Sequence, residues 1–176
     1  MLATGGTIAG SGARGTGRAY VPGRIGIAEM AAEIQALGIA AELDAVEIAA
    51  IGSQDIGWHE WDRLHGQIVA AQATHAVDGV IVTHGTDSAE ETALLLDLAL
   101  PAGDPVVLVG AMRPVDAVGS DGMRNFANAV RVASDPGAAG RGVLVVMGDQ
   151  VFAASDVRKA STSSIDAFRG FPRGPI

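Results

Sequence analysis

Short runs of apolar residues recur along the chain, and most of them end in a turn that contains glycine or threonine. Continuous runs of this length predict buried parallel strands, because a parallel sheet is covered on both faces. The runs occupy residues 46–51, which one glutamate interrupts, and residues 80–82, 106–109 and 143–147. A short stub at residues 1–3 precedes the first glycine turn. We therefore expect a central parallel sheet built from these runs.

Helical periodicity fills the intervals between the apolar runs. Apolar residues recur every three or four positions within residues 25–37, 58–73 and 123–133, which predicts amphipathic helices there. A further helix should begin at Ser88, because Ser88 and Glu91 have the spacing of a capping box. Its leucines lie nearly all round the helix, which predicts that it is well buried. They are Leu94, Leu95, Leu96 and Leu98.

Strands and helices thus alternate through most of the chain. This order predicts an α/β fold with a parallel sheet, helices on both faces and right-handed connections. Two segments interrupt the alternation: the glycine-rich residues 10–23, which should form a long surface loop, and the more polar residues 152–176. Ligands of open α/β sheets collect at the carboxyl ends of the strands, so the turns there are the first place to seek chemistry.

Composition narrows the class of protein. The chain has 176 residues, of which 48% are hydrophobic and 18% charged, as in a globular protein with one domain. A net charge of −8 without a basic tract argues against a nucleic-acid partner.

No stretch approaches the ~18 apolar residues of a membrane span, and no signal peptide is visible. We expect a cytoplasmic protein with no membrane partner. Because the chain begins and ends abruptly, we also expect it to be a piece of a longer protein.

Several kinds of site are excluded or disfavoured. The chain has no cysteine, which excludes disulfides, thiolate zinc sites and cysteine nucleophiles. The four histidines lack the spacing of a helical zinc site, and His84 is expected instead to brace its glycine turn by hydrogen bonds. Residues 10–15 match the dinucleotide pattern G-x-G-x-x-G, but the residues that follow, up to Pro22, cannot form the helix that this motif must open. We expect neither a metal nor an organic cofactor.

Two threonines are the best candidates for chemistry. Thr7 follows the first glycine turn and Thr86 follows the apolar run at residues 80–82, so both should reach the same rim of the sheet. A threonine hydroxyl attacks poorly until a base accepts its proton. Tyr20 could relay that proton for Thr7, and Asp87 could hold Lys159 as a base. Each of these residues alone has a structural explanation, such as a turn, a helix cap or a solvated surface, and only their combination favours an active site.

Motifs spread along nearly the whole chain add a resemblance. Residues 3–10 (ATGGTIAG) and 83–92 (THGTDSAEET) are the most specific of them. The others are residues 51–55 (IGSQD), 109–114 (VGAMRP), 120–122 (SDG), 141–147 (RGVLVVM) and 156–159 (DVRK). In this order they resemble the bacterial-type L-asparaginases, whose two signature motifs are the first pair. Ser53-Gln54 is similar to the type II, or asparaginase-glutaminase, branch.

The resemblance implies a fold and a set of catalytic residues. Residues 1–176 would form the family's larger N-terminal domain, with a three-layer, flavodoxin-like parallel sheet, and a smaller α/β domain follows it in the family. Thr7 would attack the side-chain amide of asparagine, and Tyr20, on a lid loop, would help to activate it. Thr86, Asp87 and Lys159 would form a second triad that assists proton transfer and the attack of water.

It also implies how the substrate is held. Ser53, Gln54 and Asp87 would bind the α-carboxylate and α-amino groups of asparagine, or of glutamine. Main-chain donors near Gly6, together with Thr86, would stabilise the oxyanion, where losing one donor typically costs ~10²–10³ in rate. In the family a neighbouring subunit completes the site. The resemblance therefore implies a homo-oligomer, a homotetramer, for the complete protein, and weak or no activity for these 176 residues alone.

The chain departs from the family pattern at one signature position and leaves two alternatives open. Ser88 stands where the family usually has threonine. One alternative is the amidase subunit of a tRNA-dependent amidotransferase, against which the acidic charge and the lack of an RNA-binding extension argue. The other is a catalytically silent amino-acid-binding module, which would keep Ser53, Gln54 and Asp87 without needing a working Thr7.

Overall fold

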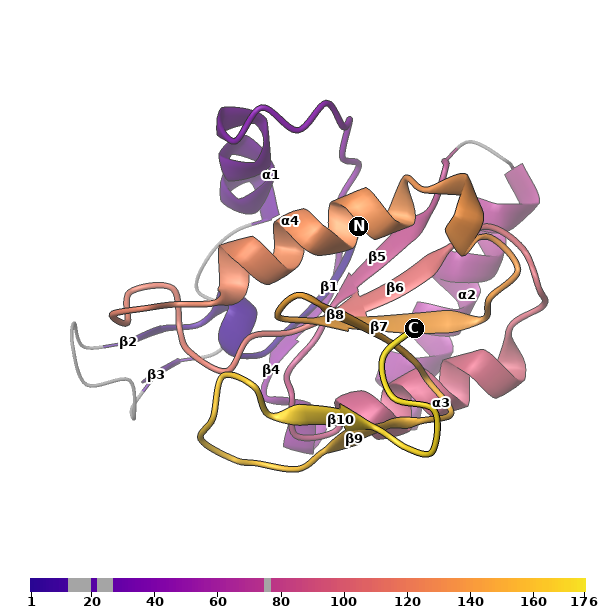
Figure 1. Ribbon diagram of the computed structural model, residues 1–176. Helices are drawn as coiled ribbons and strands as arrows, with labels where there is room; N and C mark the ends of the chain where they lie inside the picture. The colour runs from indigo at the N-terminus through magenta and orange to yellow at the C-terminus, as the bar shows by residue number, and fades with distance from the viewer. Residues whose placement is uncertain (13–19, 22–26, 75–76) are drawn as a thin grey trace.

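A six-stranded sheet forms the centre of the computed structural model, which describes residues 1–12, 20–21, 27–74 and 77–176 (Figure 1). The strands lie in the order β4-β1-β5-β6-β7-β8, and those from β4 to β7 run parallel. They are β1 (Leu2–Gly5), β4 (Val46–Ile51), β5 (Val80–Thr83), β6 (Val106–Val109), β7 (Val143–Met147) and β8 (Gln150–Ala153). The five parallel strands have the flavodoxin-like order, second-first-third-fourth-fifth along the chain, as predicted.

Helices cover both faces of the sheet (Figure 1). They are α1 (Ile27–Ala36), α2 (Trp58–Thr74), α3 (Ala89–Ala99) and α4 (Gly122–Ala133). Val80 and Val82 of β5 pack toward α2 and α3, whereas Ile81 packs toward α1 and α4. Successive strand residues face opposite sides, so an apolar run supplies both cores at once. The α/β prediction with three layers is confirmed.

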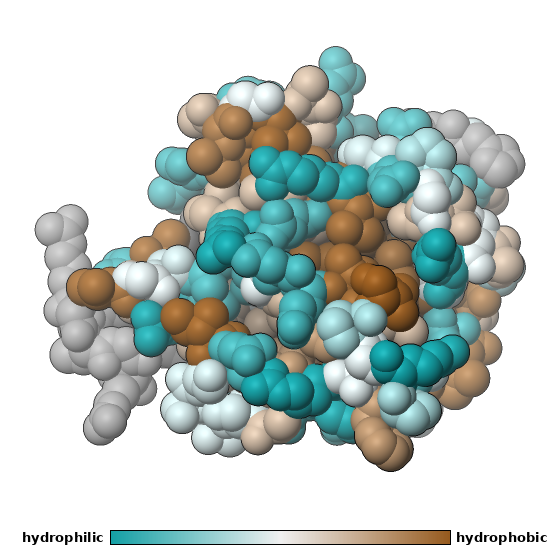
Figure 2. Space-filling model, viewed as in Figure 1, coloured by the Kyte–Doolittle hydropathy of each residue, from teal (hydrophilic) through white to brown (hydrophobic). Residues whose placement is uncertain are grey.

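The sheet ends in an antiparallel strand that the apolar pattern did not predict. Strand β8 turns back on β7 after only Gly148 and Asp149, and Gly148 adopts a φ of 63° that suits a tight turn. The backbone N–H of Ile176 donates to the carbonyl of Val151 at 2.8 Å, so the last residue described partly covers the edge strand. In Figure 2 hydrophobic surface gathers near β8 and the C-terminus, where Ile176 is exposed.

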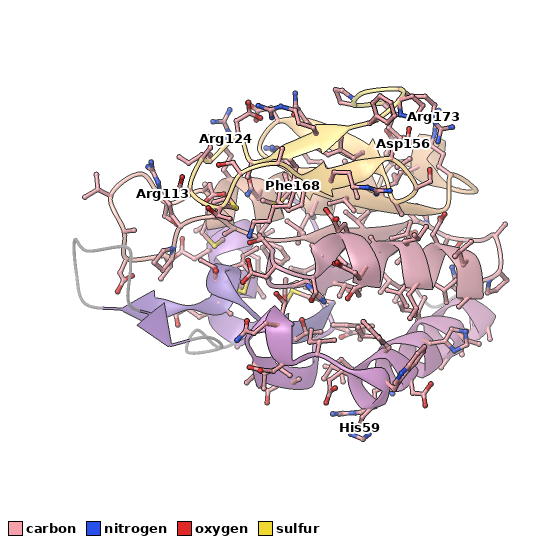
Figure 3. The ribbon with its side chains drawn as sticks, turned by 90° about the horizontal axis from the view of Figure 1, so that it is seen from below. His59, Arg113, Arg124, Asp156, Phe168 and Arg173 are labelled. Carbon is pink, nitrogen blue, oxygen red and sulfur yellow. The ribbon has the colours of Figure 1, made fainter. Side chains whose placement is uncertain are left out.

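A separate two-stranded ribbon lies beside α3. Strands β9 (Val157–Lys159) and β10 (Phe168–Gly170) pair antiparallel with each other, and Val157 and Phe168 are buried against the core on the α3 side of the sheet. The carboxylate of Asp156 accepts hydrogen bonds from the Arg173 guanidinium at 2.6 and 2.9 Å, and the two side chains lie together in Figure 3. These contacts place Lys159 above the rim of the main sheet.

Other expectations are corrected. Leu98 is 79% exposed, so α3 is buried on one face and not all round. Within residues 10–23, expected as a long surface loop, two short strands were not foreseen: β2 (Ser11–Gly12) pairs antiparallel with β3 (Tyr20–Val21). Residues 13–19 and 22–26 lie outside the described part. Short 3-10 turns occur at Thr7–Ala9, Ser53–Asp55 and Pro136–Ala138. Among the helices of the described residues, none has the length and apolar character needed to cross a membrane.

Candidate active site

The strand order reverses its direction between β1 and β5. From β1 the chain crosses over one face to β4, and it later leaves β5 over the other face through α3. Because the two connections diverge, the carboxyl ends of β1 and β5 form the topological switch point of the sheet, which is where α/β sheets bind ligands. Thr7 lies two residues beyond β1 and Thr86 lies three residues beyond β5, and each is 6% exposed. Both threonines therefore lie in turns at the carboxyl ends of neighbouring parallel strands.

Close backbone contact at Gly6 and Gly85 brings the two turns together. Gly6 has φ 74° and ψ −174°, and its N–H donates to the carbonyl of Ile51 at 3.0 Å. A Cβ added to Gly6 would overlap the Cα and N of Gly85, and one added to Gly85 would overlap Ser53. Only glycine allows this approach, so Gly6 and Gly85 set the separation of the turns that contain Thr7 and Thr86.

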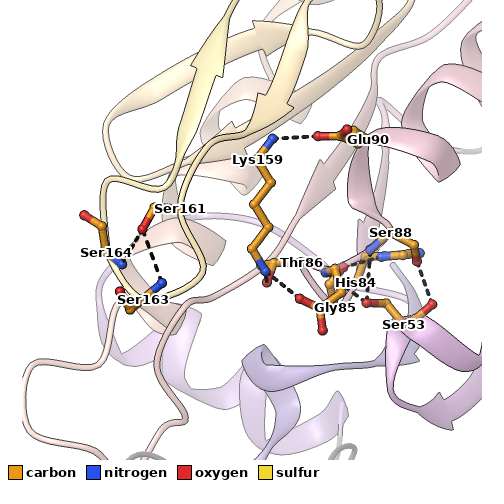
Figure 4. A network of polar contacts seen from close by, with 11 residues as sticks. Ser53, His84, Gly85, Thr86, Ser88, Glu90, Lys159, Ser161, Ser163 and Ser164 are labelled. Atoms are coloured by element: carbon orange, nitrogen blue, oxygen red, sulfur yellow. Dashed lines mark hydrogen bonds and ion pairs between the residues drawn. The ribbon is translucent and has the colours of Figure 1, made fainter.

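Lys159 reaches from β9 to the turn after β5 (Figure 4). Its ammonium Nζ donates to Thr86 Oγ1 at 2.8 Å and to Asp87 Oδ1 at 2.6 Å. The Lys159 side chain is 13% exposed, whereas that of Asp87 is 63% exposed. A charged donor between a carboxylate and a hydroxyl makes short, directional hydrogen bonds, which hold the three groups in one arrangement. The structure therefore joins the side chains of Thr86, Asp87 and Lys159 through hydrogen bonds, while their catalytic role stays a prediction.

Ser53 is part of the same rim and replaces the expected capping box. Its Oγ accepts from the backbone N–H groups of Asp87 at 3.1 Å and Ser88 at 3.3 Å, and the Ser88 hydroxyl donates to the Ser53 carbonyl at 2.6 Å. Ser88 therefore makes no side-chain cap on α3, and the capping-box prediction is wrong. Since Ser53 Oγ is an acceptor in both contacts, its own proton remains available for a donor role.

The structure does not bring every predicted site residue to this cluster. Gln54 is exposed, and its Nε2 donates to Asp55 Oδ2 at 3.0 Å, so its side chain turns toward its neighbour. Tyr20 is placed only by its backbone in β3, opposite Gly12, and its side chain lies outside the described part of the structure.

His84 braces the turn, as predicted. Its Nδ1 lies 2.6 Å from the carbonyl oxygen of Gly85, and because a carbonyl only accepts, Nδ1 has the proton. The ring is fully buried, and burial lowers its pKa to about 4 even though the bond to Gly85 acts to raise it. The Nε2 atom has no partner among the residues that are described. A neutral, uncharged histidine is therefore a structural part of the rim.

Two features of the rim escaped the sequence analysis. Glu90 Oε2 accepts from the backbone N–H of Lys159 at 2.6 Å. Asn125, which is fully buried, donates to the carbonyl of Gly110 and accepts from the N–H of Gly148, both at 3.0 Å. It thereby ties together the ends of β6 and β7. A glutamate in the first turn of a helix is already explained by the helix dipole, and a single asparagine within a predicted helix has no distinctive pattern. Neither residue therefore draws attention in the sequence.

Comparison with known proteins identifies the family. The family model for the N-terminal part of asparaginases matches residues 1–176. The chain belongs to the asparaginase family. It is 44% identical over 168 residues to a probable periplasmic L-asparaginase of Haemophilus influenzae, covering 96% of this chain and 48% of that protein. It is 41% identical to L-asparaginase 2 of Escherichia coli, covering all of this chain and 50% of that protein.

Other members extend the likeness. A glutaminase-asparaginase of Pseudomonas fluorescens is 38% identical, with 100% of this chain and 49% of that protein covered. The crystal structure of a probable cytoplasmic L-asparaginase from Campylobacter jejuni superposes with a TM-score of 0.94 at 36% identity, covering 99% of this chain and 53% of that chain. The chain spans about half the length of the curated relatives it matches. The predicted family membership is therefore confirmed.

Among the described residues, no group of three or more histidine, aspartate or glutamate side chains is placed to hold a metal ion.

Proposed function

We propose that this member of the asparaginase family hydrolyses the side-chain amide of L-asparagine to L-aspartate and ammonia through a threonine acyl-enzyme. The observation that supports this most directly is the position of Lys159 Nζ, within hydrogen-bond distance of both Thr86 Oγ1 and Asp87 Oδ1. The cluster lies beside the turn that contains Thr7, at the rim where α/β sheets bind small ligands.

In the first step Thr7 Oγ1 attacks the amide carbon of asparagine. The hydroxyl proton passes to a neighbouring base, for which Tyr20 is the candidate, and the carbonyl oxygen gains negative charge. Backbone N–H groups near Gly6 and the Thr86 hydroxyl would stabilise that oxyanion. The C–N bond then breaks, and the amide nitrogen leaves as ammonia with the proton that Thr7 released. A β-aspartyl ester on Thr7 remains.

In the second step water hydrolyses the ester. Thr86 would orient the water and relay its proton to Lys159, which acts in this step from its unprotonated amine form, and Asp87 would stabilise the ammonium that the transfer creates. The bond between the aspartyl carbon and Thr7 Oγ1 then breaks, and the proton passes from Lys159 to Thr7 Oγ1. Aspartate leaves, and neither step requires a metal or organic cofactor.

The substrate's backbone groups would be held at the outer side of the rim. Ser53 can donate its hydroxyl proton to the α-carboxylate, because its oxygen already accepts from two backbone N–H groups. The exposed carboxylate of Asp87 can accept a hydrogen bond from the α-amino group. Gln54 would have to rotate away from Asp55 to take part. Glutamine is a second candidate substrate, since one extra methylene changes binding by only ~1–3 kcal/mol.

The deciding experiment measures ammonia release from asparagine. Weak or no turnover by residues 1–176 alone stays a prediction, so the full-length gene product is assayed beside them. Thr7→Val and Thr86→Val should each lower kcat by at least ~10³ with the fold intact. Thr83→Val is the matched control. The Thr83 hydroxyl is buried without a partner among the described residues, and its loss should leave turnover unchanged. An active Thr7→Val variant would overturn the proposal.

A titration with aspartate separates catalysis from binding. An amino-acid-binding module would bind aspartate by calorimetry and release no ammonia, whereas the proposed enzyme does both. The amidase subunit of a tRNA-dependent amidotransferase would release ammonia only with its partner, and the net charge of −8 does not favour an RNA-linked assembly. We also infer a cytoplasmic, homo-oligomeric protein, which size-exclusion chromatography with light scattering and cell fractionation would test.

A further inference from the structure

Lys159 lies on a ribbon that pairs with itself and not with the main sheet. The N–H groups of successive residues in a strand point to opposite edges, and here they bind different elements. The N–H of Ala160 donates to Ala167, on the β10 side, at 2.7 Å, whereas the N–H of Lys159 points the other way, toward α3. The edge of β9 nearest α3 is therefore attached through a side chain instead of a strand.

That side chain belongs to Glu90. It is the second residue of α3, three positions after Asp87 and four after Thr86, and its Oε2 accepts from the Lys159 N–H at 2.6 Å (Figure 4). Residues 86–90 therefore bind Lys159 at both ends: Thr86 and Asp87 bind the ammonium, and Glu90 binds the backbone N–H. We propose that Glu90 is a positioning residue that fixes the Cα of Lys159 so that Nζ stays between Thr86 and Asp87. The inference rests on the proposed function for its catalytic consequence.

The physical reason is the flexibility of the lysine side chain. An ammonium on a four-carbon stem has many rotamers, so its position is defined only when both ends of the side chain are held. Glu90 holds the backbone end, and Thr86 and Asp87 hold the ammonium end. If the backbone end moves by about 1 Å, the loss in rate is on the order of 10²-fold.

The competing explanation is that Glu90 only stabilises the helix. Glu91 stands next to it in the same first turn and has the same charge, but it is exposed and is not at the Lys159 backbone. Both acids interact with the helix dipole, whereas Glu90 alone has the contact with β9 described above. Glu91→Ala is therefore a matched control that removes the dipole interaction and leaves the proposed positioning contact intact.

The kinetic test uses the full-length gene product and asparagine. Glu90→Ala should lower kcat about 10- to 100-fold with KM changed less than about threefold, since the substrate-binding groups are untouched. Glu90→Gln keeps an acceptor oxygen at the same reach and should recover most of the activity. Glu91→Ala should stay within about twofold of the parent. Equal losses in Glu90→Ala and Glu91→Ala, or no loss in either, would overturn the inference.

A double-mutant cycle tests whether Glu90 acts through Lys159. Adding Glu90→Ala to a Lys159→Ala variant should cause no further loss in kcat, because the group being positioned is gone. If the factors by which the two substitutions lower kcat multiply in the double variant, Glu90 acts independently of Lys159 and the inference fails. If Glu90→Ala does not fold, Glu90→Asp, which shortens the reach by one methylene, takes its place in both comparisons.

Hydrogen exchange supplies a readout that does not depend on activity. The Lys159 amide should exchange at least about tenfold faster in Glu90→Ala than in Glu91→Ala, while amides of β6 keep their protection. A parent protein that releases no ammonia but shows this exchange pattern would refute the proposed function and leave the contact standing. Unchanged exchange at Lys159 in an active protein would refute the inference alone.

Discussion

Replacing Gly6 by alanine tests the contact that sets the spacing of the two threonine turns. Gly6 has φ 74° and ψ −174°, a region essentially reserved for glycine, where another residue costs about 1–3 kcal/mol. The new methyl group would also overlap the Cα and N of Gly85. These are backbone atoms that cannot turn aside, and overpacking of this kind costs about 1–3 kcal/mol more. Gly6→Ala should therefore lower the free energy of unfolding by about 2–6 kcal/mol.

Gly38 provides the control for this prediction. It also has a positive φ, 71°, but nothing lies within 4 Å of the place its Cβ would occupy. Gly38→Ala should therefore cost only the backbone term, about 1–2 kcal/mol, and should leave ammonia release unchanged. Urea unfolding gives both free energies, and the ammonia assay on the folded variants gives the effect on the rim. If the two variants lose the same stability and keep the same turnover, the contact with Gly85 does not have the role assigned to it.

Three further predictions concern His84, Asn125 and Lys159. Buried His84 has its pKa lowered to about 4, so the unfolded chain binds its proton first. The contribution of neutral His84 to the free energy of unfolding should be fully present above pH ~6.5, and about 3 kcal/mol should be lost as the pH falls toward 4. Urea unfolding across this pH range should show that His84→Asn removes the pH dependence and that exposed His59→Asn keeps it. Asn125→Ala should cost about 2–4 kcal/mol of unfolding free energy, because it leaves the Gly110 carbonyl and the Gly148 N–H, just beyond β6 and β7, without their partner. The partly exposed Asn128→Ala should cost about 1 kcal/mol. Equal costs would refute that account. Lys159→Met should lower kcat by about 10²–10⁴ with an unchanged melting curve, and turnover within tenfold of the parent would contradict the role of the ammonium.

Much of the sheet could be predicted because its strands are buried on both faces. The apolar runs at β6 and β7 have the bounds that the pattern predicts, since a strand covered on two sides must be apolar throughout. The bounds of β4 were also predicted, although β4 is an edge strand in which only Ile48 is fully buried. Strand β8 was missed because it lies at the edge and is only half-buried. Its signal was the Gly148-Asp149 pair between two short runs, which is typical of a tight hairpin.

The candidate site divides in the same way between local and long-range information. Thr86 and Asp87 are neighbours in the sequence, so a single turn reveals both. Lys159 lies 72 residues after Asp87, so their pairing was only one possibility among the candidate residues until the structure joined their side chains. Ser88 matched a capping box, yet its hydroxyl donates to the Ser53 carbonyl, because a tertiary partner at 2.6 Å replaces the local one. Predictions from local sequence patterns fail where segments far apart in the sequence come into contact. Three such segments, which contain Ser53, Thr86 and Lys159, meet at this rim.

The β9–β10 ribbon has a consequence for how such a protein loses its activity. Its two strands bond to each other, so the ribbon can lift from α3 without breaking any pairing within the six-stranded sheet. Departure of the ribbon would withdraw the amine and leave both hydroxyls where they are. The cost of that movement is the exposure of Val157 and Phe168, so apolar packing, and not strand pairing, would decide how readily the amine is lost.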